Sequence, residues 1–556
     1  MRHPRPYDVI VLALLLLVPA AGLFSRPQDK PKLKRKQIAA AEQVIGLSFT
    51  KAERDSLLKD VEENRASYDS LRALELPNAV APALLFNPVP EDKTFDTRQV
   101  PIVYSPIDTV KVPEKLEDLA FYSVAQLAEL LRTQQVTSMQ LTTMYLERLK
   151  RLGPQLECVV TLTEELALSQ AQRADEEIAA GTYRGPLHGV PYGAKDLLAA
   201  KGYPTTWGAV PYKDQVIDED ATVVQRLEGA GAVLIAKLTL GALAWGDVWF
   251  GGKTRNPWNL EQGSSGSSAG SAAATAAGLV PFAIGSETWG SIVSPSTRCG
   301  ATGLRPTYGR VSRAGAMALS WSMDKLGPIC RNVEDCALVF DAIRGPDGLD
   351  PTVVDLPFNY HYREDLAGLH IGYVESAFEE DYPNQARDQA VLDVLRELGA
   401  ELVPINLPDY PIDELAFILS AEAAAAFDEL TLSDRDDLLV RQIRNAWPNS
   451  FRSSRFIPAV EYIQANRIRW QVIQEMERIL AEVDLYVSPA FVGDNLLLTN
   501  LTGHPCVVLP NGFNDQGSPT SITFMGQLYD EATILAVARA YQEATGWHLT
   551  HPAAFR

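Results

Sequence analysis

Short apolar runs alternate with amphipathic stretches along most of the chain after residue 120. The runs have the length and composition of buried strands: HGVPYGA (188–194), GAVLIAKL (231–238), LHIGYV (369–374), ELVPINL (401–407), DLYVSPA (484–490) and CVVLP (506–510). Stretches such as DQAVLDVLREL and RWQVIQEMERILAEV lie between them, with apolar residues at helical spacing. Strands that alternate with helices predict an α/β fold with a large mixed β-sheet flanked by helices.

Two helix starts mark the beginning of this main domain. Ser123 is followed three residues later by Gln126, the pattern of a capping box, and Thr137 precedes a second amphipathic stretch. Residues 37–85 have apolar positions at helical spacing between charges, and the segment that follows contains too many prolines for regular elements. We expect residues 26–115 to form a small helical N-terminal extension with a proline-rich strap, and residues 116–556 to form the main domain.

The first 25 residues have the layout of a targeting segment. Arg2 and Arg5 precede the apolar run VIVLALLLLV (9–18), and small residues follow it. This order is typical of a cleaved signal peptide and predicts an exported or periplasmic protein. KPKLKRK (30–36) disfavours export of the following chain, so an uncleaved membrane anchor is the alternative, with membrane association through this segment.

Charge and composition exclude several classes of function. The net charge of −20 argues against a nucleic-acid partner, because phosphate binding needs a basic surface. The five cysteines are scattered, and no histidine stands in a zinc-binding spacing. The sequence therefore predicts neither a disulfide framework nor a metal site.

Two tracts of small residues are the strongest candidates for chemistry. GSSGSSAGSAAATAAG (263–278) has the composition of a linker, and GSETWGSIVSPS (285–296) follows an apolar run. Residues 266–270 match G-x-S-x-G, the nucleophile elbow of α/β-hydrolases, centred on Ser268, but the preceding RNPWNLEQG is polar rather than strand-like. A glycine-rich loop at a helix start instead offers free backbone amides to an oxyanion that forms beside a serine.

A serine nucleophile needs a base, and Lys195 is a candidate for it. Lys195 ends the apolar run before GAKD, where a lysine is either a surface residue or a desolvated base. To act as a base near neutral pH its pKa must fall by about three units.

The segments GVPYGAKD, GSSGSSAGSAAATAAGLVPFAIGSETWGSIVSPS, CGATGLRPTYGRVSRAG, SMDKLGPICR and NLTGHPCVVLPNGF together resemble the amidase signature family. The resemblance covers roughly three quarters of the chain, from about residue 121 to 541, with the motifs in the family order. It implies that residues 116–556 form an amidase signature domain. It also implies a Ser–Ser–Lys triad: Lys195 as the base, Ser267 as a bridging serine with a cis peptide bond, and Ser291 as the nucleophile.

The same resemblance implies an oxyanion hole made by the backbone amides of Thr288, Trp289 and Gly290 together with Ser291 itself. Several positions depart from the family pattern. Trp289 replaces a glycine and is expected to narrow the acyl site, Val293 replaces an arginine, and Glu287 replaces an aspartate. In the first tract, Ser265 and Ala269 also replace glycines.

The activity that the resemblance implies is hydrolysis of linear amides through an acyl-enzyme, with a small-molecule amide as substrate and no cofactor. The sequence leaves two alternatives open. The resemblance extends to the glutaminase (A) subunit of the glutamyl-tRNA amidotransferase, and a catalytically idle binding homologue would carry the same motifs.

Overall fold

An 11-stranded mixed sheet, with the strand order β1-β3-β2-β8-β10-β9-β14-β15-β13-β11-β12, forms the centre of the larger of two units. The computed structural model describes residues 32–72, 74, 77–80, 82–91 and 93–556. By their internal contacts the residues divide into a small unit, 1–75, and a large unit, 76–556. The strands of the sheet are β1 (Val159–Leu162), β2 (Pro191–Lys195), β3 (Val233–Leu238), β8 (Phe282–Glu287), β9 (Thr302–Arg305), β10 (Lys325–Cys330), β11 (His370–Val374), β12 (Glu401–Ile405), β13 (Leu485–Pro489), β14 (Cys506–Phe513) and β15 (Pro519–Gly526).

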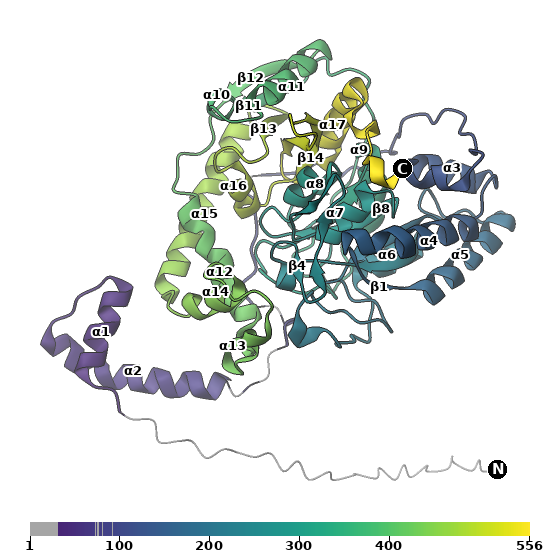
Figure 1. The fold of residues 1–556 in the computed structure, drawn as a ribbon. Coiled ribbons are helices and arrows are strands. Elements are labelled where there is room, and N and C mark those ends of the chain that lie inside the picture. Colours follow the sequence, from purple (N-terminus) through teal and green to yellow (C-terminus); the bar gives the residue numbers. More distant parts are fainter. Residues whose placement is uncertain (1–31, 73, 75–76, 81, 92) are drawn as a thin grey trace, which may run out of the picture. The chain divides into compact units, whose positions relative to one another are not determined.

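Helices flank this sheet (Figure 1), so the expected α/β fold with a mixed sheet is confirmed. Each apolar run named above contributes a strand, and the capping boxes at Ser123 and Thr137 begin helices as predicted. The main helices of the large unit are α3 (Val124–Arg132), α4 (Ser138–Leu156), α5 (Glu164–Ala179), α6 (Thr222–Gly229), α7 (Ala269–Ala276), α8 (Val293–Cys299), α9 (Val333–Ile343), α11 (Gln385–Glu397), α12 (Phe417–Ala426), α14 (Trp447–Ser454), α15 (Ala459–Leu480), α16 (Asn495–Thr502) and α17 (Glu531–Thr545).

Parallel pairing brings the candidate site to one edge of the sheet. β2 lies between β3 and β8 and is parallel to both, with Ala194 opposite Ile284. The carboxyl ends of parallel strands meet at the same edge. Lys195, the last residue of β2, therefore lies beside the end of β8 and the loop that follows it.

The small unit contains α1 (Arg35–Ile45) and α2 (Lys51–Arg72), held together by an ion pair between Arg54 and Glu42 at 2.6 Å. The expectation of helix as far as residue 85 is wrong, because α2 ends at Arg72 and a proline at residue 77 begins the strap. No helix within the described ranges is long and apolar enough to cross a membrane. The apolar run at residues 9–18 lies outside the described residues.

The strap, residues 77–115, belongs to the large unit and runs along it with little regular structure. Side chains fasten it at intervals. Phe86 packs edge-on against Tyr308 with ring centroids 5.0 Å apart, and Lys93 forms an ion pair with Glu477 at 2.5 Å. Farther along, Val103 forms a β-bridge with His361. The division of the chain at residues 25 and 115 stays a prediction.

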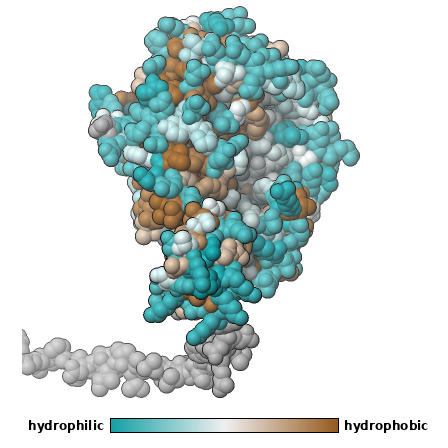
Figure 2. Space-filling view, turned by 90° about the vertical axis from the view of Figure 1, so that its left-hand side faces the viewer, coloured by the Kyte–Doolittle hydropathy of each residue, from teal (hydrophilic) through white to brown (hydrophobic). Residues whose placement is uncertain are grey.

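Apolar patches interrupt the otherwise hydrophilic surface on the face shown in Figure 2. Among the exposed apolar side chains of the large unit are Leu84 and Leu85 of the strap and Ile463 of α15. These three residues line one groove, which lies between the strap and α15. The strap therefore covers α15 only in part.

Candidate active site

Lys195 lies at the centre of the candidate site and is fully buried. Its side-chain nitrogen, Nζ, lies 2.8 Å from Ser267 Oγ, 3.0 Å from Ser268 Oγ and 2.8 Å from Ser286 Oγ. Three hydroxyl groups from the two small-residue tracts thus surround one amine. The structure brings together Lys195 and Ser267, as the sequence predicts, and adds Ser286.

The carboxylate next to Lys195 in the sequence does not pair with it. Asp196 forms a buried ion pair with Lys237 at 2.8 Å and also accepts a hydrogen bond from the Thr206 backbone N–H at 2.9 Å. Burial lowers the pKa of Lys195 well below its ordinary value, although the charges of Asp324 and Glu287 partly oppose this effect. Lys195 is therefore held in an environment that favours the neutral amine.

The first tract forms the loop before α7. The Gly266–Ser267 peptide bond is cis, at the position that the family resemblance implies. Ser265 adopts a φ of 60°, in the left-handed region that favours glycine, and its hydroxyl lies 2.7 Å from Ser294 Oγ. Gly270, in the first turn of α7, has no room for a side chain, because an added Cβ would lie 2.5 Å from the Thr239 nitrogen.

The nucleophile-elbow alternative does not fit this loop. The preceding strand, β7 (Asn259–Gly263), pairs with β6 (Arg255–Asn256) in a separate two-stranded sheet. Ser268 is fully buried, and its hydroxyl accepts a hydrogen bond from the Ser286 N–H at 3.1 Å while donating to the Ser286 carbonyl at 3.0 Å. Ser268 therefore braces the end of β8.

The second tract leaves β8 and turns into α8, and it carries Ser291. The Ser291 carbonyl accepts a hydrogen bond from the Ser268 N–H at 3.1 Å, which places the two tracts side by side. Among the described residues, the Ser291 hydroxyl makes no hydrogen bond, and neither do the backbone N–H groups of Trp289, Gly290 and Ser291. Gly290 has a φ of 79°, so the chain turns sharply just before Ser291. This loop offers a hydroxyl and backbone donors to a bound group.

Glu287 fixes this loop from inside. Its carboxylate accepts hydrogen bonds from the N–H groups of Ile292 and Val293 at 2.8 and 2.9 Å. It also pairs with Arg305 at 2.8 Å and accepts a bond from the Asn500 side chain at 2.8 Å. Burial alone would raise the pKa of Glu287, but Arg305 and these hydrogen bonds lower it to about 2. Glutamate at this position therefore acts as a fixed anion at the start of α8.

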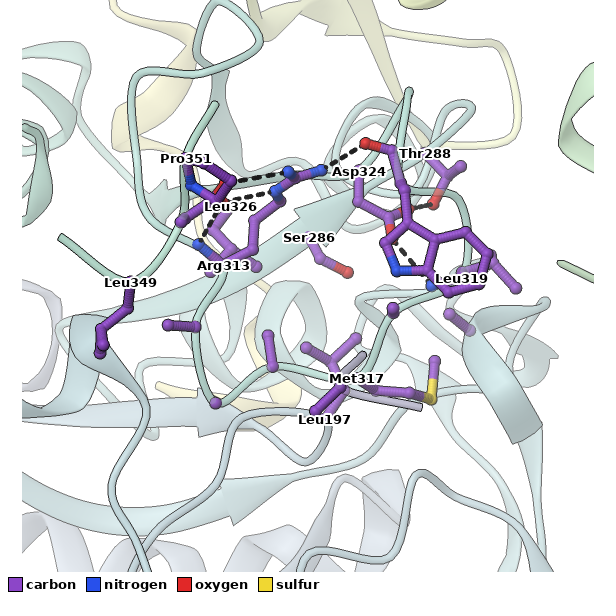
Figure 3. Close-up of a pocket in the computed structure, with 18 residues that line it drawn as sticks. Leu197, Ser286, Thr288, Arg313, Met317, Leu319, Asp324, Leu326, Leu349 and Pro351 are labelled. Atoms are coloured by element: carbon purple, nitrogen blue, oxygen red, sulfur yellow. Dashed lines mark hydrogen bonds and ion pairs between the residues drawn. The ribbon is translucent and has the colours of Figure 1, made fainter. Parts of the chain in front are cut away.

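A pocket of about 110 Å³ opens beside Ser286 and Thr288. Figure 3 shows Ser286 between two polar groups, with Arg313 on one side and Thr288 bonded to Asp324 on the other. Most of the remaining lining is apolar, including Met317, Leu319 and Leu326. Neither Trp289 nor Ser291 lines this pocket, and Trp289 is 42% exposed. The narrowing of the acyl site by the indole of Trp289 stays a prediction.

Two members of the site are visible only in the structure. Ser286 lies in GSETWG and Asp324 lies in SMDKLGPICR, but nothing in the spacing of these residues indicates a role. The Thr288 hydroxyl donates to Asp324 at 2.6 Å, and the other carboxylate oxygen accepts from the N–H groups of Leu319 and Ser320 at 2.8 and 2.9 Å. Asp324 therefore ties Thr288, in the loop after β8, to the loop after Arg313.

Comparisons with known proteins agree with this architecture. The Amidase family model matches residues 140–535. The chain is 35% identical over 479 residues to the A subunit of the glutamyl-tRNA(Gln) amidotransferase from Methylococcus capsulatus, covering 78% of this chain and 98% of that protein. It is likewise 35% identical over 473 residues to the corresponding A subunit from a Roseiflexus species, covering 76% of this chain and 96% of that protein.

Among solved structures, the native peptide amidase from Stenotrophomonas maltophilia is similar, with 30% identity and a TM-score of 0.70. That match covers 77% of this chain and 98% of the peptide amidase. The region that the family model matches contains both small-residue tracts and the strand that ends at Lys195. The chain therefore belongs to the amidase signature family and is a hydrolase of carbon–nitrogen bonds.

Proposed function

We propose that this protein hydrolyses linear amides through a seryl acyl-enzyme, with Lys195, Ser267 and Ser291 as the catalytic residues. The observation that carries the proposal is the 2.8 Å contact between Lys195 Nζ and Ser267 Oγ in a fully buried setting. A neutral amine hydrogen-bonded to a hydroxyl can take up a proton passed along that hydroxyl. The free Ser291 hydroxyl beside the same loop supplies the nucleophile.

In the first half of this mechanism the Ser291 oxygen attacks the amide carbonyl carbon. The Ser291 proton passes to Ser267, whose own proton passes to Lys195. The carbonyl oxygen becomes an oxyanion, and the backbone N–H groups of Thr288, Trp289, Gly290 and Ser291 stabilise it. The proton then returns through Ser267 to the amide nitrogen, the C–N bond breaks, and the amine leaves.

In the second half a water molecule attacks the acyl-enzyme. Its proton follows the same route to Lys195, and the ester bond to the Ser291 oxygen breaks as the proton returns to that oxygen. The products are a carboxylic acid and free enzyme. The scheme requires no cofactor, and the proposed substrate is a small-molecule amide without nucleic acid.

The experiment is a panel of linear amides incubated with the purified full-length protein, followed by intact mass measurement. Primary amides, peptide amides, amino-acid amides and anilides cover the chemical range. We expect release of ammonia or amine from at least one class, and a fluorophosphonate adduct that maps to Ser291. An adduct on another residue, or no adduct and no turnover, would overturn the proposal.

A second candidate rests on the relatives named as the A subunit of a glutamyl-tRNA(Gln) amidotransferase. Under this alternative the chain would release ammonia from glutamine within a larger assembly. Affinity purification of the native protein distinguishes the two. Stable partner subunits together with glutamine hydrolysis would favour the amidotransferase role, whereas turnover by the isolated chain favours the freestanding amidase.

A further inference from the structure

The strap reaches the candidate site through a tight turn. The Val80 N–H donates to the Pro77 carbonyl at 2.9 Å, so Asn78 and Ala79 occupy the two central positions of a β-turn. The side chains at these two positions point away from the turn. In this turn Asn78 projects toward the protein, and Ala79 lies at the pocket beside Ser286 and Thr288.

Asn78 binds the wall of that pocket in two directions at once. Its side-chain oxygen accepts a hydrogen bond from the Ala318 N–H at 2.7 Å, and its nitrogen donates to the Ala318 carbonyl at 2.8 Å. The same nitrogen lies 3.3 Å from the carbonyl of Ala426, the last residue of α12. The Asn78 side-chain amide thus bonds both backbone groups of Ala318, as a neighbouring strand would, and also contacts the end of α12.

Ala318 belongs to the loop that lines the pocket, residues 313–321, which we call the pocket loop. One carboxylate oxygen of Asp324 accepts hydrogen bonds from the backbone N–H groups of the next two residues, Leu319 and Ser320. The other oxygen accepts a hydrogen bond from the Thr288 hydroxyl. The pocket loop is therefore linked through Asp324 to Thr288 and through Ala318 to Asn78, besides its other contacts. Loss of the Asn78 contacts would remove the link between the pocket loop and the strap turn.

Ala79 stands at the mouth of the pocket, where it is exposed to solvent. The mouth also includes Leu349, which is 68% exposed, and the small residues 314–316. A volume of about 110 Å³ is small beside the roughly 300–1,000 Å³ that is usual for larger organic ligands. A larger side chain at residue 79 would therefore reduce the space at this mouth.

The strap lies outside the part of the chain that the family model matches, residues 140–535. The relatives are covered almost completely, yet about a fifth of this chain has no counterpart in them. Ala79, the strap residue that lines the pocket, thus lies outside the region that the family model matches.

We propose that the strap completes the substrate site, with Ala79 as the residue that limits the size of the group admitted beside Ser286 and Thr288, and Asn78 as the positioning residue that holds it there. The proposal rests on the proposed amidase function and assigns to it small, largely apolar groups at this pocket. Bulky groups at the same position would be excluded.

The test uses two sulfonyl fluorides of different width, methanesulfonyl fluoride and phenylmethanesulfonyl fluoride, on the full-length protein. The Ser291 oxygen forms a bond to sulfur, fluoride leaves, and the Ser291 proton passes to Lys195. Rates of adduct formation at Ser291 are measured by intact mass, and the ratio of the phenyl to the methyl reagent is the readout. This ratio needs no knowledge of the natural substrate.

We expect Ala79→Trp to lower the ratio at least tenfold while leaving the methyl reagent within about threefold of its rate. Asn78→Ala should raise the ratio, because the turn is no longer held across the mouth. In the double variant, the tryptophan is also no longer held there, so the ratio should return toward the wild-type value. A residue with a merely structural role would slow both reagents alike. Val80→Trp, on an exposed neighbour that does not line the pocket, is the matched control.

An unchanged ratio in Ala79→Trp, or an equal effect of Val80→Trp, would overturn the strap proposal while Ser291 still reacts. Failure of both reagents to modify Ser291 in the wild-type protein would instead overturn the amidase proposal. Melting curves of each variant show whether an altered ratio comes from a folded protein.

Discussion

Lys195 is buried among hydroxyl groups, and the carboxylate next to it in the sequence pairs with Lys237 rather than with it. A buried ammonium group without a close counter-ion loses its proton readily, because desolvation disfavours the charged form. The environment of this one side chain therefore determines whether the site can act as a base. Its titration is the most direct property to measure.

We expect the rate of acylation to rise with pH as Lys195 loses its proton, with an apparent pKa well below that of an ordinary lysine. The direction follows from the lowered pKa of Lys195, since only the neutral amine accepts the Ser291 proton. Lys195→Ala should lower kcat/KM by several orders of magnitude. Pre-steady-state acylation across pH values checks this, with His188 and His504 variants as controls. A profile controlled by either histidine would refute the assignment.

Ser291 and Ser268 provide a second pair to compare. Ser291→Ala should abolish turnover and adduct formation, because it removes the proposed nucleophile. Ser268→Ala should retain most of the activity, because its hydroxyl braces the Ser286 backbone rather than reacting. Intact mass after treatment with a fluorophosphonate measures both. Retention of labelling in Ser291→Ala with loss in Ser268→Ala would restore the nucleophile-elbow interpretation.

Some of the candidate site residues could be predicted from the sequence, and others could not. Lys195, Ser267 and Ser291 could be named because they lie in motifs with a recognisable order. Ser286 and Asp324 could not, because their roles arise only where the end of β8 meets Lys195 and the pocket loop. Contacts between segments distant in the sequence leave no periodic pattern in the chain.

At the scale of elements, Glu287 joins the end of β8 to the start of α8 and so fixes the loop that carries Ser291. Its folded-state pKa of about 2 lies below the ordinary value of 4.5. A carboxylate with a lowered pKa stabilises the folded state above its ordinary pKa, and this stability is lost as the pH falls toward the folded value. The shift corresponds to about 3 kcal/mol at neutral pH.

We expect Glu287→Gln to lower the free energy of unfolding at pH 7 by about 3 kcal/mol, because it leaves Arg305 buried without its partner. The difference from the wild-type protein should shrink between pH 4.5 and pH 2 as Glu287 itself becomes protonated. Denaturant unfolding at several pH values measures it. Glu364→Gln, at an exposed position, is the control. A difference that stays constant with pH would show that charge at Glu287 is not the cause.

Across the whole molecule, the α/β sheet and its helices followed from the alternation of apolar runs and amphipathic stretches. The strap did not. Its prolines predicted an extended segment, but the bonds of Asn78 reach a residue 240 positions away, and no local pattern encodes such a contact. The end of α2 was also misplaced, because charged and apolar residues continue at helical spacing toward the first proline of the strap.

The first 36 residues support two predictions about the location of the protein, and these exclude each other. If residues 9–18 are the core of a signal peptide, the chain is cleaved just after the small residues that follow this run. The mature protein then begins near residues 22–25 and is recovered from the periplasm or cell envelope. If KPKLKRK keeps the following chain from crossing, the N-terminus stays intact in the membrane fraction. N-terminal sequencing of the native protein from each cell fraction distinguishes them. An intact chain in the soluble cytoplasm would contradict both and would favour the amidotransferase role, since tRNA is found there and not in the periplasm.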